Sequence, residues 1–433
     1  MHPKMSFVPL VPLMPEVWIC CRINAIFVWL YFHTKAATVN SNMLMNPGST
    51  RIFLTTSPIN CLFYLIYLRQ HPVEGVKDIL VIDSGGIQTT TTTQFIRELA
   101  AQHPWFQLMD FSHALPVGQS ISPKASLRKR LTWRLKKAPV FKPVYSALLK
   151  VYKNRHDKHY ARRIKKQLLE NIAPESVSTL FLNTKTHLNS TFTGLFKTAE
   201  VIYMEHGMGD YFILEQEKHL PMKFSCLFDE AFRKYLAPAR AEIVPFYHAQ
   251  YFQEAVQNYL TGHRAAVDFR SIPHPTKKNL LVLLQNVEFF GIDPAIQLTF
   301  LDSILTEMGA GDYYFILKPH PRQSAEVIAF IKNYLDAKGV AYYLLDAEEL
   351  KSINIEIIFA AWQEKITAVF TMFSSALFYL SKLFPSNEIR FFYNYEILRR
   401  EIDTFTPNFR EEYLACAGLI EHVFAENCIE MKS

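Results

Sequence analysis

Apolar runs of strand length alternate with helix-like segments along most of the chain. Such a run without polar alternation is typical of a strand buried on both faces of a parallel sheet. The expected strands of the first half are 51–57, 78–83, 106–110, 179–183, 201–204, 223–228 and 242–246. Those of the second half are 279–284, 313–317, 341–345, 365–371 and 389–393. Helical spacing between many of these runs predicts an α/β fold whose parallel strands are joined by right-handed crossovers.

A polar stretch with two prolines, residues 269–278, separates the two series of strands and is typical of a linker. Two successive α/β sheets predict two Rossmann-like domains that face a cleft, an arrangement suited to a nucleotide-linked donor and an acceptor. The expected organisation is a poorly defined leader at 1–45, an N-terminal domain at 46–268 with a basic helical insertion at 120–170, a C-terminal donor domain at 279–400 and a helical tail at 401–433.

The leader, residues 1–45, has no apolar run long enough to predict a membrane span, since Arg22 and Asn24 interrupt the best candidate. It also lacks a clean cleavage site for a signal peptide. Two interpretations stay open for it: a short membrane-contacting extension, or a start codon assigned too far upstream.

Charge changes this picture at one segment. The 433 residues carry a net charge of +6, and 49% of them are hydrophobic, the balance of a globular protein with a substantial core. Residues 124–166 hold sixteen Lys or Arg and one acid, Asp157. Such a segment suits an anionic partner, such as an acidic polymer, lipid head groups or nucleic acid, but a solvated helical face has the same composition.

The six cysteines form no Cys-x-x-Cys pair and have no histidine at zinc-ligand spacing. This usage predicts a reducing compartment and no structural metal.

The strand at Tyr313–Leu317 ends in the segment Lys318–Arg322, which reads Lys-Pro-His-Pro-Arg. Its two prolines restrict the backbone and hold His320 on a stiff loop. Ligands of open parallel sheets bind beyond the carboxyl ends of the strands. A tunable imidazole between two cations therefore predicts a phosphate site, although a basic loop that merely ends a core strand is the plainer interpretation.

Two further clusters follow predicted strands. Glu205-His206-Gly207 offers a carboxylate that could act as general base, with a glycine that permits close approach of a ligand. Ser374-Ser375 begins a predicted helix, where hydroxyls and free N–H groups can bind phosphate or simply cap the helix. Each cluster alone is a weak signal, whereas the three at successive strand ends are more specific.

No Asp-x-Asp motif lies in a loop where it could hold Mg²⁺ on a diphosphate. This absence favours a donor with a single phosphate as leaving group, such as CMP, over a metal-dependent nucleotide-diphosphate-sugar enzyme.

With these motifs the sequence resembles the bacterial sialyltransferases, in particular the capsular α-2,8-polysialyltransferase and lipooligosaccharide sialyltransferase families. Those families carry an acidic-acidic-Gly motif, then a His-Pro motif, then a Ser-Ser/Thr motif. The matching residues, in the same order, are Glu205-His206-Gly207, His320-Pro321 and Ser374-Ser375. The layout is similar over roughly residues 50–400.

The resemblance implies a GT-B fold, CMP-sialic acid as donor, and no metal or other cofactor. It implies that Glu205 is the general base and that His320 contacts the CMP phosphate and acts as acid. The implied phosphate-site residues are Gly207, Lys318, Pro321, Arg322, Ser374 and Ser375. His206 departs from the family pattern, which has a second acid there, so the base is Glu205, His206 or Asp210.

The implied acceptor is a capsule or lipooligosaccharide glycan, with an anionic acceptor favoured by residues 124–166, and no nucleic acid is expected. The implied location is cytoplasmic, with peripheral contact at the inner membrane left open.

Two rival functions remain at this level. One is another transferase that acts on a cytidylate donor: a polyol-phosphate transferase using CDP-glycerol or CDP-ribitol, or a CMP-Kdo transferase. His206-Gly207, His320-Pro321-Arg322 and Ser374-Ser375 also resemble the motifs of the polyol-phosphate enzymes. The other is a non-catalytic protein that binds acidic polymer through residues 124–166, which predicts salt-sensitive binding that is indifferent to His320.

Overall fold

The structure is a computed structural model of residues 1–433. It describes residues 49–83, 90–111, 160–184, 186, 188–207, 210, 222–227, 241–245, 249–262, 271–290, 292–309, 311–347, 350–351, 353–404, 410, 423–426 and 428–431. The chain divides into two units, Met1–Asn46 and Pro47–Ser433. All described residues belong to the second unit.

The first sheet has seven strands in the order β3-β2-β1-β4-β5-β6-β7, and every pairing in it is parallel. Its strands are β1 (Thr50–Thr55), β2 (Lys77–Ile82), β3 (Gln107–Asp110), β4 (Val177–Leu182), β5 (Glu200–Met204), β6 (Met222–Cys226) and β7 (Ala241–Pro245). The strand order reverses between β1 and β4, which is where ligands of such sheets usually bind.

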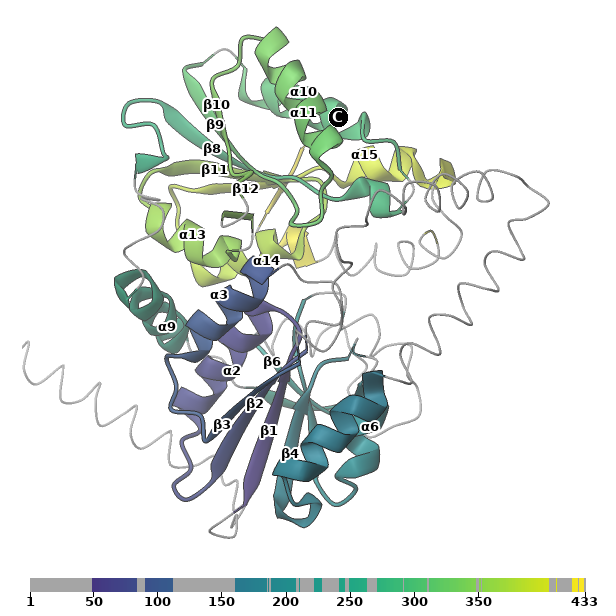
Figure 1. The fold of residues 1–433 in the computed structure, drawn as a ribbon. Coiled ribbons are helices and arrows are strands. Elements are labelled where there is room, and N and C mark those ends of the chain that lie inside the picture. The colour runs from purple at the N-terminus through teal and green to yellow at the C-terminus, as the bar shows by residue number, and fades with distance from the viewer. Residues whose placement is uncertain are drawn as a thin grey trace, which may run out of the picture. The chain divides into compact units, whose positions relative to one another are not determined.

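The second sheet has six parallel strands in the order β10-β9-β8-β11-β12-β13. Its strands are β8 (Lys278–Leu283), β9 (Tyr313–Lys318), β10 (Tyr342–Leu344), β11 (Ile366–Thr371), β12 (Arg390–Tyr393) and β13 (Ile429–Glu430). The order reverses between β8 and β11. Two parallel Rossmann-like sheets confirm the predicted α/β fold of GT-B type (Figure 1).

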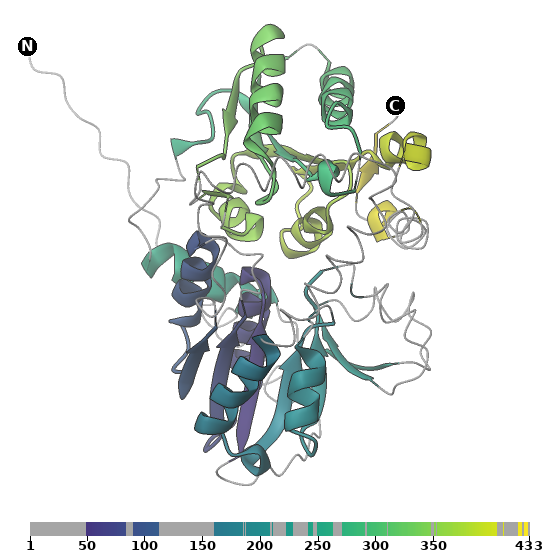
Figure 2. The ribbon, with the colours of Figure 1, turned by 45° about the vertical axis from the view of Figure 1, so that its right-hand side comes forward.

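Helices alternate with the strands, as the crossovers between parallel strands require (Figures 1 and 2). Those associated with the first sheet are α2 (Pro58–Gln70), α3 (Thr90–Ala100), α6 (Asn189–Leu195) and α9 (Ala249–Gly262). Those of the second are α10 (Ile296–Met308), α11 (Ala325–Ala337), α13 (Ile355–Trp362), α14 (Ser375–Leu383) and α15 (Tyr395–Arg400).

Strand β1 shows why continuous apolar runs mark this fold. Phe53 packs in one hydrophobic cluster with buried residues of α2 and α3. Ile52 and Leu54 point to the other face and join a second cluster, which includes Phe192 of α6. Because both faces of the sheet are covered, every residue of β1 is buried and no polar alternation is possible.

One buried ion pair joins two neighbouring strands of the first sheet. Arg51 of β1 lies opposite Asp78 of β2, and its guanidinium donates to both carboxylate oxygens at 2.7 and 2.9 Å. His103 also contacts this carboxylate at 3.3 Å. Burial tends to raise the pKa of Asp78, but these partners hold it below its usual range.

Ser57 caps helix α2 directly after β1. Its hydroxyl accepts from the Asn60 N–H at 3.4 Å and donates to the Asn60 side-chain oxygen at 2.9 Å, and Pro58 takes the first helical position. We expect Ser57→Ala to lower the free energy of unfolding by about 1 kcal/mol, because a helix N–H loses its acceptor. Urea denaturation measures the change. Ser178→Ala, which removes a hydroxyl bonded to the Thr50 carbonyl rather than a cap, is the comparison. Equal stability of wild type and Ser57→Ala would contradict the capping role.

The structure adds elements that the sequence pattern did not predict. Helices α9, α13 and α15 were not expected, and the C-terminal segment, expected to be helical, also supplies strand β13, which pairs with β12. Helix α9 buries Phe252, Ala255, Val256 and Tyr259 on one side. It packs against both α2 and α13.

The predicted leader, residues 1–45, lies outside the described residues. The predicted basic insertion, residues 120–170, is described only from residue 160 onward. The proposed domain boundaries stay predictions. Within the described part of the chain, no helix is long and apolar enough to cross a membrane.

Candidate active site

The loop after β5 carries Glu205, whose carboxylate is fully buried. Its backbone N–H donates to the Ser225 carbonyl at 2.9 Å, which extends the pairing of β5 with β6 by one residue. One carboxylate oxygen accepts from the Leu227 N–H at 2.7 Å, and the other accepts from the hydroxyl of Tyr379 on helix α14. Glu205 therefore joins the end of β5 to α14, the helix between β11 and β12 of the second sheet.

His206 is held by Asp210, four residues later. The Asp210 carboxylate accepts from the His206 backbone N–H at 2.5 Å and contacts the imidazole Nδ1 at 3.3 Å. It also accepts from the hydroxyl of Thr184, which follows β4. The His206 side chain retains 30% exposure, whereas that of Asp210 is fully buried.

Asp210 keeps its charge in this buried place. Burial tends to raise the pKa of its carboxyl, but the charge of His206 and hydrogen bonds from His206 and Thr184 outweigh burial and lower that pKa. An ionised carboxylate on Nδ1 places the imidazole proton there and leaves the lone pair on Nε2. This is the arrangement that makes a histidine an effective base.

Gly207, the last residue of the motif, lies against the Ser374-Ser375 motif. A β-carbon placed on Gly207 would lie 3.7 Å from the Ser375 hydroxyl oxygen, which is van der Waals contact. The Ser374 side chain caps α14 by accepting from the Ala376 N–H at 3.3 Å, and both serines are half-buried. Two of the three predicted motifs thus meet, although more than 160 residues separate them.

His320 follows β9 on the predicted loop. Its Nδ1 accepts from the Arg322 N–H at 3.1 Å, so the imidazole proton lies on Nε2, which is then a hydrogen-bond donor. Burial, followed by the positive charges of Arg322 and Lys318, lowers the pKa of His320 to about 4. The imidazole is therefore neutral at pH 7. Pro321 and Arg322 are exposed beside it.

Strand β8 lies between β9 and β11, so the His320 loop and the Ser374-Ser375 motif leave the same edge of the sheet two strands apart. With neighbouring strands about 4.8 Å apart, their separation at the strand ends is roughly 10 Å. The segment that follows β8 fills this interval: the Asn286 side chain donates to the Arg322 carbonyl at 3.5 Å. Asn286 did not stand out in the sequence.

The sequence matches the model of the alpha-2,8-polysialyltransferase (POLYST) family over residues 139–392, more than half of the chain. This chain belongs to the alpha-2,8-polysialyltransferase family. It is a glycosyltransferase, and its substrates are a nucleotide-sugar donor and a glycan acceptor. The interpretation as a non-catalytic binder of acidic polymer is thereby set aside.

Among solved structures, the chain is similar to UDP-GlcNAc 2-epimerase from Neisseria meningitidis, with 10% identity over 88% of this chain and 94% of that one, at a TM-score of 0.47. It is also similar to UDP-GlcNAc 2-epimerase from Methanocaldococcus jannaschii, with 12% identity over 86% and 92%, at a TM-score of 0.43. A third is E. coli ADP-heptose lps heptosyltransferase II, with 11% identity over 80% and 85%, at a TM-score of 0.32. No curated protein sequence matches the chain.

In this polysialyltransferase-family chain, Lys318 has a different setting from its neighbours on the loop. Its side chain is buried, and its ammonium donates to the carbonyls of Leu350 and Lys351 at 2.9 and 2.7 Å. Burial lowers the pKa of Lys318 to about 7, against the opposing charge of buried Glu356. These bonds tie β9 to the chain ahead of α13, so a phosphate contact by Lys318 stays a prediction.

The part of the polysialyltransferase-family chain that the structure describes holds no group of three or more His, Cys, Asp or Glu side chains able to bind a metal ion. Two functional candidates were missed in the sequence: Tyr379, the partner of Glu205, and Thr184, a partner of Asp210. For Tyr379 a signal existed, because it lies four residues after Ser375 and hence on the same side of the helix.

Proposed function

We propose that this protein transfers sialic acid from CMP-sialic acid to a cell-surface glycan of the capsule or lipooligosaccharide class, without a metal ion or other cofactor. The observation that carries the proposal is the nearness of Gly207 to Ser375, whose hydroxyl oxygen lies 3.7 Å from where a β-carbon on Gly207 would be. It joins the motif after β5, which would face the acceptor, to the motif at the start of α14, which would bind the donor phosphate.

On the donor side, the CMP phosphate lies between the Ser374 and Ser375 hydroxyls and the Nε2–H of His320. A neutral imidazole suits this role, because it donates a hydrogen bond in the ground state and its pKa rises as the phosphate brings negative charge. Pro321 keeps the loop stiff, and the exposed Arg322 adds positive charge. A monophosphate leaving group has less charge to neutralise than a diphosphate.

On the acceptor side, His206 removes the proton from the attacking hydroxyl. The hydroxyl oxygen forms a bond to the anomeric carbon of sialic acid as the bond from that carbon to the CMP phosphate oxygen breaks. The proton goes to Nε2 of His206, and CMP leaves with its charge stabilised by His320 and the serines. Glu205, the base that the resemblance implies, is fully buried with both oxygens engaged, and this favours His206.

We place the reaction at the inner face of the membrane, on an anionic acceptor. Support comes from the basic segment, whose described end at 160–166 is helical. There Ile164 is buried while Arg162, Lys165 and Lys166 are exposed, so one side of the helix is cationic. Such a face attracts an acidic glycan or anionic head groups.

The donor is tested directly. Purified protein is incubated with CMP-sialic acid, CMP-Kdo or CDP-glycerol, an oligosialic acid or lactoside acceptor is added, and products are read by mass. We expect acceptor-dependent CMP release from CMP-sialic acid, unchanged by EDTA. Turnover of CDP-glycerol or CMP-Kdo in its place would reject the sialyl donor, and loss of turnover in EDTA would reject metal independence.

A further inference from the structure

Helix α14 carries two different contacts on one side. Its first turn bears Ser374 and Ser375, and one turn later Tyr379 reaches Glu205. Residues four apart lie above one another on a helix, so Ser375 and Tyr379 face the same way. Gly207 lies beside Ser375, and Glu205 accepts a hydrogen bond from Tyr379. The Glu205–Gly207 loop therefore lies along about one turn of α14.

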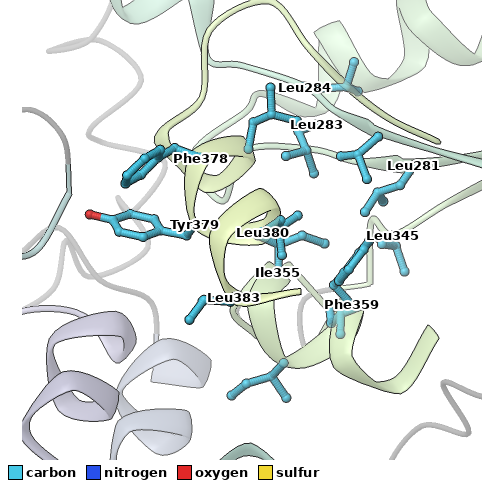
Figure 3. Packing of buried hydrophobic residues seen from close by; sticks show 14 of the residues in the cluster. Leu281, Leu283, Leu284, Leu345, Ile355, Phe359, Phe378, Tyr379, Leu380 and Leu383 are labelled. Carbon is cyan, nitrogen blue, oxygen red and sulfur yellow. The ribbon is translucent and has the colours of Figure 1, made fainter. Parts of the chain in front are cut away.

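The Tyr379 hydroxyl is committed to this contact. Burial, and then the negative charge of Glu205, raise the pKa of Tyr379 well above its usual value, so the hydroxyl keeps its proton and donates. Around it, Phe63 of α2 packs edge-on at 6.0 Å between ring centres and Phe378 at 5.6 Å. Figure 3 shows the Tyr379 hydroxyl pointing away from the labelled leucines of the second sheet's core, among them Leu380 and Leu383.

A buried hydrogen bond between a tyrosine and a carboxylate is more than a packing contact. A bond to a charged group is stronger than a bond between neutral groups, and loss of one partner leaves the other buried and unsatisfied. Glu205 has a second fixed donor in the Leu227 N–H at 2.7 Å. Its carboxylate is thus held between the first sheet and α14, and His206 is the next residue along the chain.

We propose that Tyr379 is a positioning residue: by holding Glu205, it sets the Glu205–Gly207 loop against the helix that binds the donor phosphate. The inference rests on the proposed function, because it assigns the two ends of this contact to the acceptor and the donor. Its consequence is that the base and the leaving-group site are positioned by one rigid helix. The placement of attacking and leaving groups then does not depend on loops alone.

The test is Tyr379→Phe, which removes one oxygen and keeps the ring. We expect kcat to fall about tenfold while the KM for donor and the Kd for CMP change less than threefold, because Ser374 and Ser375 stay in place. The matched control is Tyr334→Phe, which also removes a hydroxyl bound to a carboxylate, that of Asp302, on helices α11 and α10. That control is expected to keep wild-type kcat.

A double-mutant cycle decides whether Tyr379 acts through Glu205. If it does, Tyr379→Phe combined with Glu205→Gln turns over no more than about twofold more slowly than Glu205→Gln alone. A further tenfold loss in the double variant would overturn the inference, as would an unchanged kcat in Tyr379→Phe. Thermal unfolding of the four proteins provides a readout without substrate, and additive changes in Tm there would also count against the contact.

The cycle is run with whichever cytidine donor the wild type turns over. If the wild type turns over another cytidine donor but not CMP-sialic acid, the proposed donor is rejected. The double-mutant cycle with that other donor then still decides the role of Tyr379. If wild type turns over none of the three donors, the unfolding cycle and the Kd for CMP decide it.

Discussion

His320→Ala is expected to lower kcat for sialyl transfer by about 100-fold or more, which corresponds to about 2.7 kcal/mol of transition-state stabilisation. The reason is the position of its proton: Nδ1 accepts from the Arg322 N–H at 3.1 Å, so Nε2–H is the donor that meets the leaving phosphate. Alanine keeps the loop and its prolines but removes this donor. The rate of CMP release at saturating CMP-sialic acid measures the effect.

The chain provides a matched control. His274 lies in a second Pro-His-Pro sequence, and its Nδ1 also accepts a backbone N–H, that of Lys277 at 3.1 Å. It precedes β8 and so lies at the opposite edge of the sheet from His320. We expect His274→Ala to keep wild-type kcat. Equal turnover in His320→Ala and wild type would remove His320 from the mechanism.

The same histidine links stability to pH. Its pKa of about 4 in the folded state lies below the ordinary value of 6.5, so between these values the unfolded state binds more protons. Its contribution to stability is therefore complete above about pH 6.5 and is lost as the pH falls toward 4. We expect His320→Ala to weaken the decline of the unfolding midpoint in urea over this range. An identical decline in both proteins would mean that the site does not depress the imidazole pKa.

His206→Gln is expected to lower kcat at least 100-fold, against about tenfold for Glu205→Gln. Glutamine at 206 cannot take up the acceptor proton. Glutamine at 205 has a single acceptor oxygen, so it can no longer accept from both the Leu227 N–H and the Tyr379 hydroxyl, and the loop loses the bond that positions it. For Asp210→Asn we expect a loss in kcat between those of His206→Gln and Glu205→Gln, because the His206 imidazole loses the carboxylate that fixes its tautomer.

The ranking of these variants identifies the base. A loss of at least 100-fold in Glu205→Gln with a mild effect in His206→Gln would return that role to Glu205, as the resemblance implies. Thermal unfolding of each variant separates lost chemistry from lost folding. His274→Ala again controls for the removal of a histidine, because it lies at the opposite edge of the second sheet from Ser375.

Local sequence patterns identified the long strands that are buried on both faces. The Tyr313–Leu317 run was recognisable as a strand because both faces of its sheet are covered, and β9 occupies Tyr313–Lys318. Helix α9 was missed, although its buried residues, among them Phe252, Val256 and Tyr259, have helical spacing that could have revealed it. Strand β13 has only two residues, and its pairing with β12 is a long-range event without a local signal.

The candidate site divides in the same way. The motif residues and the strand ends that carry them were evident in the sequence, since the carboxyl ends of parallel strands share an edge. The hydrogen-bond partners and burial of each side chain were not evident. Lys318 and His320, two residues apart, have different environments. The Lys318 ammonium donates to backbone carbonyls of the chain ahead of α13, whereas the His320 imidazole accepts from a backbone N–H of its own loop.

By itself, the sequence determined two parallel α/β sheets, the order of three motifs and membership of a glycosyltransferase family, because hydrophobic periodicity and short motifs are local properties. The tertiary structure decided which motifs come together: Gly207 lies beside Ser375, Tyr379 holds Glu205, and Asp210 orients His206. Contacts between residues as far apart as 205 and 379 depend on how helices pack beside both sheets. Packing of that kind is set by the whole core, and no local pattern encodes it.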